Sequence, residues 1–221
     1  MAPDPSDHIG DDTRLEELWA GEFGNAYIER NASVGAGRDA FWQTWVYRLA
    51  PRTALEVGCN VGANLVWLAR LLGAQNVAGA DVNEQALEIA RGAAPGADLR
   101  QANAGALPFE DGAFDLVFTT GVLIHIPTAG LAAAMAEIVR CSSRYVLCGE
   151  YFAEEETEVL YRGERGALFK RDYGRLYRES FPDLDLIEQG FLPREGGAWD
   201  DVTYWVFECA RDDARDPDHR A

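Results

Sequence analysis

The middle of the chain alternates short apolar runs with segments whose apolar residues recur at helical spacing. The apolar runs predict strands at Ala54–Val57, Val77–Asp81, Asp98–Ala102, Leu116–Thr120 and Tyr145–Glu150. The periodic segments predict helices at Ala63–Leu72, Glu84–Ala93 and Thr128–Val139. This alternation predicts an α/β fold, a Rossmann-like doubly wound sheet that is mostly parallel and has helices on both faces.

Helical patterns also precede this core. Arg14–Arg30 has helical spacing that two glycines, Gly21 and Gly24, weaken. A second helix is expected at Arg38–Leu49, where the following Pro51 stops it. We therefore expect residues 14–50 to form a helical cap on one domain that spans residues 14–210.

The second half of the domain departs from the alternation. Phe152–Gly174 is an aromatic segment of mixed charge, inserted before a short helix around Leu176, and we expect it to form a lid or a substrate wall. Asp185–Glu188 and Thr203–Cys209 are predicted to be the last two strands. The polar ends, residues 1–13 and 211–221, are expected to be disordered tails.

The most informative segment is the turn after the first strand, Glu56-Val57-Gly58-Cys59-Asn60-Val61-Gly62. Gly58 allows a tight turn close to a ligand, and Gly62 allows the next helix to start near the strand with its N–H groups facing that ligand. Asp81 ends the following strand about 20 residues later, where a carboxylate can accept both ribose hydroxyls. The spacing differs from G-x-G-x-x-G, which argues against an NAD-dependent oxidoreductase.

These motifs together resemble the class I S-adenosylmethionine (SAM) methyltransferases over Thr53–Glu150. Asn60 departs from the family's usual E/D-x-G-x-G-x-G loop, although asparagine tolerates a left-handed backbone. The resemblance implies SAM as the cofactor, S-adenosylhomocysteine as the product and an antiparallel last strand. The residues that it places around the cofactor are Glu56, Gly58, Asn60, Gly62, Asp81, Val82, Asn103, Ala104, Thr120 and Gly121, with Asn103 and Ala104 beside the adenine and Thr120 and Gly121 at the methionine end.

The flanking segments are similar to those of the pseudaminic acid biosynthesis-associated methylases. The similarity lies in residues 19–31, 121–126, 148–152, 161–163 and 168–172. It implies an amino-sugar or sialic-acid-like sugar as the methyl acceptor. By the same likeness, Trp19, Tyr27 and Arg30 would cap the cofactor, with Arg30 holding its carboxylate.

The amino-acid composition disfavours several classes of binding partner. The formal net charge of −17 disfavours nucleic acid as a substrate, because phosphate backbones would be repelled. The four cysteines form no C-x-x-C pair and are expected to be free thiols in a reducing cytoplasm, and the sparse histidines argue against a metal site. No apolar stretch is long enough to predict a membrane span, so a cytoplasmic enzyme for a small molecule is expected.

Two residues are candidates for proton transfer. His125 follows the fourth core strand and titrates near neutral pH, although a packed histidine is an equally ordinary outcome there. Glu150 ends the fifth core strand. Tyr151, Tyr161 and Arg162 are expected to bind the acceptor, whereas the run of glutamates at residues 154–156 is expected to be solvated.

The acceptor stays open at this stage. Residues 150–172 hold more acidic than basic side chains, which suits an amine, a guanidine or an amino acid at least as well as a sugar phosphate. An N-methyltransferase of a natural-product amine is therefore the nearest alternative. A non-catalytic SAM-binding partner is a further one, and the oligomeric state is not predicted.

Overall fold

The computed structural model describes residues 14–30 and 37–210. Within these residues, seven strands form one sheet in the order β3-β2-β1-β4-β5-β9-β8. The strands are β1 (Ala54–Val57), β2 (Val77–Asp81), β3 (Asp98–Gln101), β4 (Phe114–Thr120), β5 (Ser142–Glu150), β8 (Leu184–Leu192) and β9 (Val202–Cys209). The predicted α/β fold with a mostly parallel sheet is confirmed.

The last strand runs against its neighbours, as expected. β9 lies between β5 and β8 and is antiparallel to both, with Val146 opposite Phe207 in the first pair. Because β8 is antiparallel to β9, it runs in the same direction as β5. The loop that joins β8 to β9 therefore lies at the same edge of the sheet as the loops that follow β1, β2 and β4.

Helices cover both faces of the sheet because the strand residues alternate in direction. One face carries α6 (Thr128–Cys141) and α7 (Tyr173–Ser180), which pack on Val57, Val117 and Phe207. The other face carries α3 (Asp39–Leu49), α4 (Leu65–Leu72) and α5 (Glu84–Ala93), packed on Ala54, Phe118 and Val206. Both faces are thus closed to water, which accounts for the continuous burial of β1.

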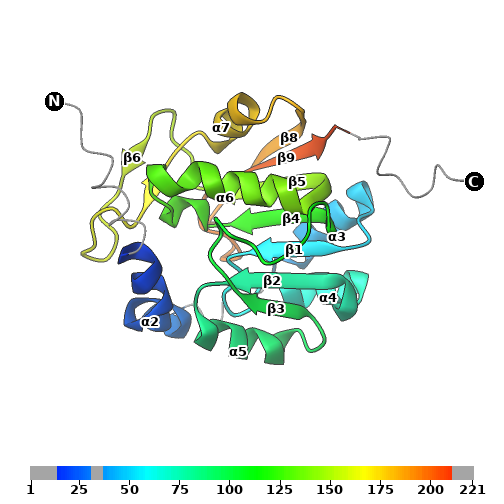
Figure 1. Cartoon of the computed structure of the whole chain (residues 1–221), viewed down its shortest axis with the longest axis horizontal. Coiled ribbons are helices and arrows are strands. Elements are labelled where there is room, and N and C mark those ends of the chain that lie inside the picture. The colour runs from blue at the N-terminus through cyan, green and yellow to red at the C-terminus, as the bar shows by residue number, and fades with distance from the viewer. Residues whose placement is uncertain (1–13, 31–36, 211–221) are drawn as a thin grey trace, which may run out of the picture.

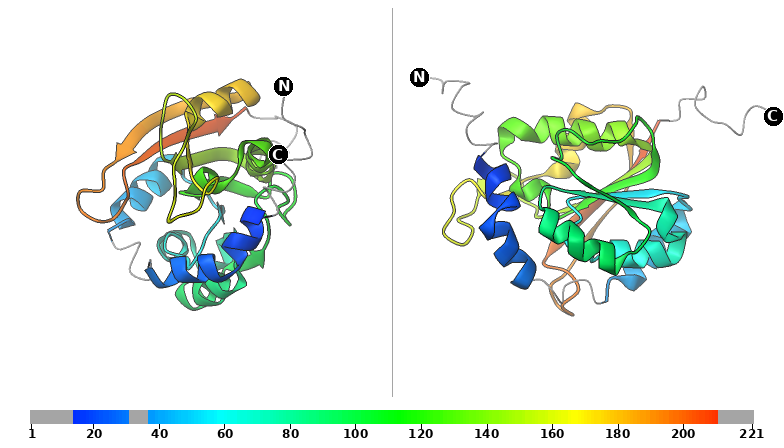
Figure 2. Two further views of the ribbon diagram at one scale, coloured as in Figure 1. Left: turned by 90° about the vertical axis from the view of Figure 1, so that its left-hand side faces the viewer. Right: turned by 60° about the horizontal axis from the view of Figure 1, so that its bottom comes forward.

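The N-terminal helical segment is bent, which the two glycines explain. Residues 14–20 are helical, Gly21 forms a bend, and α2 (Glu22–Arg30) follows. A Cβ at Gly24 would lie 1.9 Å from the carbonyl oxygen of Trp19, so only glycine permits this close approach. Figures 1 and 2 show α2 beside the carboxyl ends of the strands, at the same end of the molecule as the insertion.

The insertion contains a small two-stranded sheet. β6 (Thr157–Glu158) pairs with β7 (Phe169–Lys170), and the single-turn helix η2 (Leu123–His125) lies beside β7. A further turn, η1 (Ala74–Asn76), precedes β2. The expected insertion boundary at Gly174 is slightly long, because α7 already starts at Tyr173 with Asp172 as its N-cap.

Three other predictions concern what this part of the chain contains. The four cysteines are unpaired thiols. Across residues 14–30 and 37–210, no helix has the length and apolarity to cross a membrane, and no group of ligand side chains could hold a metal ion. The two predicted tails lie outside the described residues.

Candidate functional site

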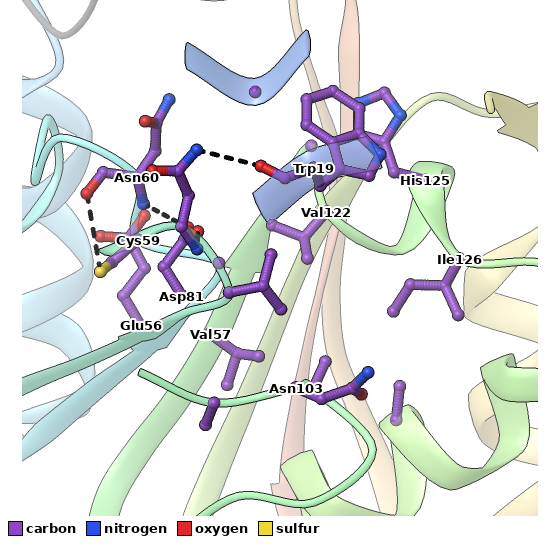
Figure 3. Close-up of a pocket in the computed structure, with 18 of the residues that line it drawn as sticks. Trp19, Glu56, Val57, Cys59, Asn60, Asp81, Asn103, Val122, His125 and Ile126 are labelled. Carbon is purple, nitrogen blue, oxygen red and sulfur yellow. Dashed lines mark hydrogen bonds between the residues drawn. The ribbon is translucent and has the colours of Figure 1, made fainter. Parts of the chain in front are cut away.

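A cavity of about 570 Å³ opens over the carboxyl ends of β1, β2 and β4. Such a volume suits a ligand of cofactor size. Of the residues predicted to bind the cofactor, the cavity is lined by Trp19, Tyr27, Glu56, Gly58, Asn60, Asp81, Val82, Asn103, Ala104, Thr120 and Gly121. Figure 3 shows Glu56, Asn60 and Asp81 gathered on one side, with Trp19 and His125 across the cavity from Asn103.

The turn after β1 has the geometry that the glycine spacing predicts. Gly58 has a φ of +72°, and its N–H donates to the carbonyl of Ala80 at 2.7 Å. A Cβ there would lie 2.3 Å from Cγ2 of Val122, which comes from the loop after β4. Gly58 is therefore needed both for its backbone conformation and for this close approach.

Gly62 has a different role from the one expected. Its φ is +78°, but it does not line the cavity, and a Cβ there would lie 3.2 Å from Cβ of Ala90 on α5. The helix also starts later than predicted, at Leu65, because residues 60–64 form turns. Gly62 thus allows α5 to pack closely, whereas Gly58 is the glycine of this turn that lines the cavity.

Asp81 is held in place by backbone N–H groups. Its Oδ2 accepts from Asn60 N–H at 2.8 Å, and its Oδ1 accepts from Asn83 N–H at 2.9 Å. Asn60, which departs from the usual glycine-rich loop, adopts a φ of 46°. Asparagine tolerates this left-handed conformation. Burial raises the pKa of Asp81, and the two N–H groups partly oppose that rise. Each oxygen keeps lone-pair capacity for another donor.

Glu56 is almost fully buried beneath the cavity. Its Oε1 accepts from Asn64 Nδ2 at 2.6 Å, whereas its Oε2 is buried without a partner among the described residues. The same Asn64 amide also donates to Thr120 Oγ1 at 2.9 Å. Burial raises the pKa of Glu56 to about 8, despite this hydrogen bond. An unpartnered buried carboxylate oxygen is costly, so it points to a missing cationic or donor group.

Arg38 is a cavity residue that the sequence analysis missed as a site residue. Its Nη1 donates to Asn64 Oδ1 at 2.9 Å, so one buried asparagine connects the guanidinium to Glu56. Its Nε donates to the carbonyl of Ala198 at 2.9 Å, and the guanidinium lies 4.2 Å from the ring centre of Trp199. No spacing rule links Arg38 to these partners, because they come from distant segments. The side chain of Arg30, the predicted carboxylate ligand, lies outside the described part.

Asn103 shapes its own loop. Its Oδ1 accepts from Gly105 N–H at 2.7 Å, and its Nδ2 donates to Glu16 Oε2 at 2.8 Å. Asn103 therefore both lines the cavity and stabilises the turn of its own loop. The bond to Glu16 also joins the N-terminal helical segment to the loop after β3.

Aromatic rings close one end of the cavity. Trp19 makes edge contacts with Tyr27 at 5.4 Å and Phe23 at 5.2 Å, and lies 4.3 Å from the ring of His125. The indole Nε1 of Trp19 is buried without a hydrogen-bond partner in the described chain. Asn83 fixes this helical segment by donating to the carbonyl of Trp19 at 3.0 Å. These contacts place the N-terminal helical segment as a cover over the cavity.

His125 lines the cavity with its ring oriented by the insertion. Nδ1 lies 2.6 Å from the carbonyl oxygen of Ala167, so Nδ1 carries the proton and Nε2 is left as an acceptor. Burial lowers the pKa of His125 to about 4, which keeps the imidazole neutral at physiological pH. A neutral ring of this kind accepts a hydrogen bond well but is a weak base.

Glu150 does not lie where the sequence analysis expected an acceptor contact. Its carboxylate is fully buried and does not line the cavity. Val122 N–H lies 3.2 and 3.0 Å from its two oxygens, and Ile124 N–H donates to Oε2 at 3.3 Å. Burial raises the pKa of Glu150 to about 7. The side chain turns inward because it supplies the acceptor for the N–H groups of η2, which no sheet partner satisfies.

The three predicted acceptor residues lie around the cavity but not in its wall. Tyr151 donates from its hydroxyl to Asp200 Oδ2 at 2.5 Å. Tyr161 lies 5.4 Å from the ring of His125, and exposed Arg162 lies 5.8 Å from the ring of Tyr161. The partner Asp200, in the loop between β8 and β9, had no signal in the sequence.

Comparison with known proteins supports the methyltransferase fold. Residues 54–144 match a family described as a methyltransferase domain. The methyltransferase GfsG of Streptomyces halstedii is 34% identical over 105 residues, which cover 44% of this chain and 37% of that relative. The chain matches less than two fifths of the length of the curated relatives.

Two solved structures share most of the fold at low identity. Magnesium protoporphyrin IX methyltransferase from Synechocystis PCC 6803 with bound SAM has a TM-score of 0.66 at 15% identity, covering 94% of this chain and 98% of the other. The 1,6-didemethyltoxoflavin-N1-methyltransferase of Burkholderia thailandensis, solved with its substrate and S-adenosylhomocysteine, has a TM-score of 0.68 at 11% identity, covering 95% and 92%. Residues 54–144 thus match a methyltransferase domain, and the chain shares the fold of these two solved methyltransferases.

Proposed function

We propose that this protein transfers a methyl group from SAM to a small polar acceptor. One observation carries the proposal: a single cavity is lined by Arg38, Glu56 and Asp81, which are one cation and two carboxylates on opposite sides of a glycine turn. SAM has a zwitterionic amino-acid end, a sulfonium and a ribose diol. The charges of the cavity complement each of these groups.

The amino-acid end of SAM fits the pair Glu56 and Arg38. An ammonium group is a donor for the buried, unpartnered Oε2 of Glu56, and its charge would lower the raised pKa of that carboxyl. Arg38 then takes the role first assigned to Arg30, as the guanidinium for the cofactor's carboxylate. Thr120 and Gly121 border the same end.

The ribose and the adenine fit the part of the cavity that runs from Asp81 to the loop after β3. Asp81 is oriented by two backbone N–H groups and keeps acceptor capacity for a diol. Val82, Asn103 and Ala104 line the cavity beyond it, where the adenine would lie. A diphosphate, as in NAD, would bring its negative charge towards Glu56 and Asp81, which disfavours that cofactor.

For methyl transfer, the protein mainly has to align the acceptor with the methyl group of SAM. SAM supplies an activated methyl group, which a lone pair of the acceptor attacks while the C–S bonding electrons return to sulfur. The protein's residues exclude water and orient the acceptor. His125 Nε2 is an acceptor for an N–H or O–H of the substrate, so His125 orients the acceptor, whereas proton transfer was the role first considered for His125 and Glu150.

A titration with three adenosine-containing ligands tests the cofactor. We expect SAM and S-adenosylhomocysteine to bind and NAD not to bind. A ligand at 100 times its dissociation constant raises the unfolding free energy by roughly 2.7 kcal/mol, which a thermal shift detects. Binding of NAD without binding of SAM would overturn the proposal.

The second part of the proposal is the nature of the acceptor. The likeness to the pseudaminic acid-associated methylases favours an amino-sugar or a sialic-acid-like sugar. An N-methyltransferase of an amine, a guanidine or an amino acid remains the second candidate, and a non-catalytic SAM-binding partner the third. The ordered imidazole of His125 at the cavity favours catalysis over binding alone. Incubation with labelled SAM and pools of small metabolites, followed by mass spectrometry, would separate these candidates.

A further inference from the structure

The charges of the insertion differ from what a count along the sequence suggests. Most of its carboxylates are engaged by the protein itself. Glu156 pairs with Arg171, Glu158 accepts from Gly166 N–H, Glu164 pairs with Arg14, and Asp172 caps α7. The acidic excess of this segment is therefore not available to attract a cationic acceptor.

Lys170, a cation of the insertion, has no such partner among the described residues. Lys170 is the only lysine among the 221 residues. It is half-buried, and its Nζ lies 5.9 Å from the ring centre of Tyr151. In the part of the chain that the structure describes, no carboxylate lies within ion-pair distance of it. An ammonium without a carboxylate partner is free to pair with an oxyanion from outside the protein, so Lys170 is a candidate ligand for a negatively charged group.

The strand geometry separates Lys170 from its neighbour Arg171. Arg171 is 2% exposed, and its guanidinium donates to the carbonyls of Leu123 and Ile126 at 3.4 and 3.0 Å. Successive side chains of a strand point to opposite sides, so Lys170 points away from η2 and towards Tyr151. Arg171 fixes the segment after β4 that contains η2, and Lys170 lies on the opposite side of β7.

Tyr151 connects Lys170 to the cavity. Its hydroxyl donates to Asp200, and the adjacent Trp199 stacks on Arg38, which lines the cavity. Burial, followed by the hydrogen bond to Asp200, raises the pKa of Tyr151, so its phenol stays a donor. The rings of Tyr151 and Trp199 thus form part of a rim, each with a cation beside it.

The rim continues on the insertion side with Tyr161. This ring lies 5.4 Å from His125 and 6.4 Å from Trp19, both of which line the cavity. Arg162 is exposed and lies 5.8 Å from the same ring. Two positive side chains of the insertion therefore flank tyrosines that surround the cavity opening.

We propose that the methyl acceptor is an anion, a small molecule whose carboxylate or phosphate is held by Lys170 with support from Arg162. This inference rests on the proposed methyltransferase function and specifies its substrate class. An oxyanion supplies the negatively charged partner that Lys170 lacks among the described residues. It also lies beside two tyrosines. The hydroxyl of Tyr161 can donate to an acceptor hydroxyl, and the hydroxyl oxygen of Tyr151, whose proton is donated to Asp200, can accept from one. A cationic amine would instead meet two positive side chains at the opening.

The experiment starts from protein saturated with S-adenosylhomocysteine, whose binding is measured first by calorimetry. Failure of that step would count against the proposed function and not against the anion site. Four sugars are then titrated at constant ionic strength: glucuronate, glucose 6-phosphate, neutral glucuronamide and cationic glucosamine. We expect one of the two anions to bind at least about tenfold more tightly than glucuronamide. Which anion binds distinguishes a carboxylate from a phosphate.

Variants locate the effect. Lys170→Met keeps the length of the side chain and removes its charge, and it should abolish the preference for the anion. Lys170→Arg should retain most of it. Arg165→Gln is the matched control, because Arg165 is an exposed cation of the same insertion and should leave the preference unchanged. Equal affinity for the anions and glucuronamide, tighter binding of glucosamine, or an unchanged preference in Lys170→Met would each overturn the proposal.

Discussion

The cofactor side and the acceptor side of the cavity are built in different ways. On the cofactor side, Gly58 and Asp81 belong to consecutive strands, and backbone N–H groups fix the carboxylate. On the acceptor side, Trp19, Tyr161 and Asp200 come from segments far apart in the sequence. A site held by backbone geometry restricts the residue types that it accepts. A site made of side chains from several segments can change its chemistry while the sheet stays the same.

The largest effect should follow from a change to the turn itself. Gly58→Val should abolish binding of SAM, because a side chain there is strained at a φ of +72° and would collide with Val122. Calorimetry with S-adenosylhomocysteine measures the loss. Gly92→Ala is the control, since a Cβ on that helical glycine meets nothing within 4 Å and should leave binding intact. Normal binding by a folded Gly58→Val variant would mean that the turn is not part of the site.

The next effect concerns the ribose. Asp81→Ala should weaken SAM binding about tenfold or more, because hydrogen bonds to a charged group contribute roughly 1.5 to 3 kcal/mol. Asp98→Ala provides the comparison, as Asp98 is an exposed carboxylate paired with Arg100 on the neighbouring strand. If both variants bind SAM equally well, the carboxylate at the end of β2 does not contact the cofactor.

The pH dependence of SAM affinity should test whether Glu56 binds the amino-acid end of SAM. The free protein holds the pKa of Glu56 at about 8, and pairing with an ammonium requires the ionised form. SAM binding should therefore release a proton, and affinity should rise roughly tenfold from about pH 6.5 to about pH 8. Calorimetry in buffers of different ionisation enthalpy measures the released proton. Glu56→Gln should flatten the dependence, and a steep dependence in that variant would assign the proton elsewhere.

The same carboxyl has the opposite effect on the stability of the protein without ligand. Its folded pKa lies above its ordinary value of 4.5, so the folded state binds the proton more tightly. This contribution is complete below about pH 4.5 and is lost as the pH rises through about 8. SAM should restore stability most strongly at the upper end of that range.

The smallest effect on ligands is expected at Glu150, which joins the two sides through η2. Glu150→Gln should lower the unfolding free energy by roughly 1 to 3 kcal/mol, because an amide replaces a carboxylate oxygen that accepts buried N–H groups. Denaturant unfolding measures this loss, and SAM affinity should change much less. Unchanged stability with a large loss of turnover would return Glu150 to a catalytic role.

The difference between the two sides also explains what the sequence could predict. β1, β2 and α5 have the predicted bounds, because burial and capping there depend on local residues. The turn at Gly58 and the carboxylate at Asp81 were predictable for the same reason. The roles of Arg38 and Asp200 could not be predicted. The loop between β8 and β9, which contains Asp200, reaches Arg38 and Tyr151 only after the sheet has formed.

Two predicted roles changed because burial cannot be read from a motif. Glu150 ends a strand that points to the cavity, yet its side chain turns under η2, where unpaired N–H groups need an acceptor. Gly62 has the expected backbone, yet its missing side chain makes room for Ala90 and not for a ligand. In both cases the position needs that residue type, but the reason is a neighbouring helix and not a ligand.

The position of β9 in the sheet bears on how the chain is synthesised. Of the strands in the described residues, β9 is the last to leave the ribosome, yet it fills the gap between β5 and β8. Until residues 202–209 emerge, β5 has an open edge and β8 has no partner in the sheet. Unpaired edges of this kind attract other chains, so the nascent protein passes through a period of exposure that ends only with its final strand.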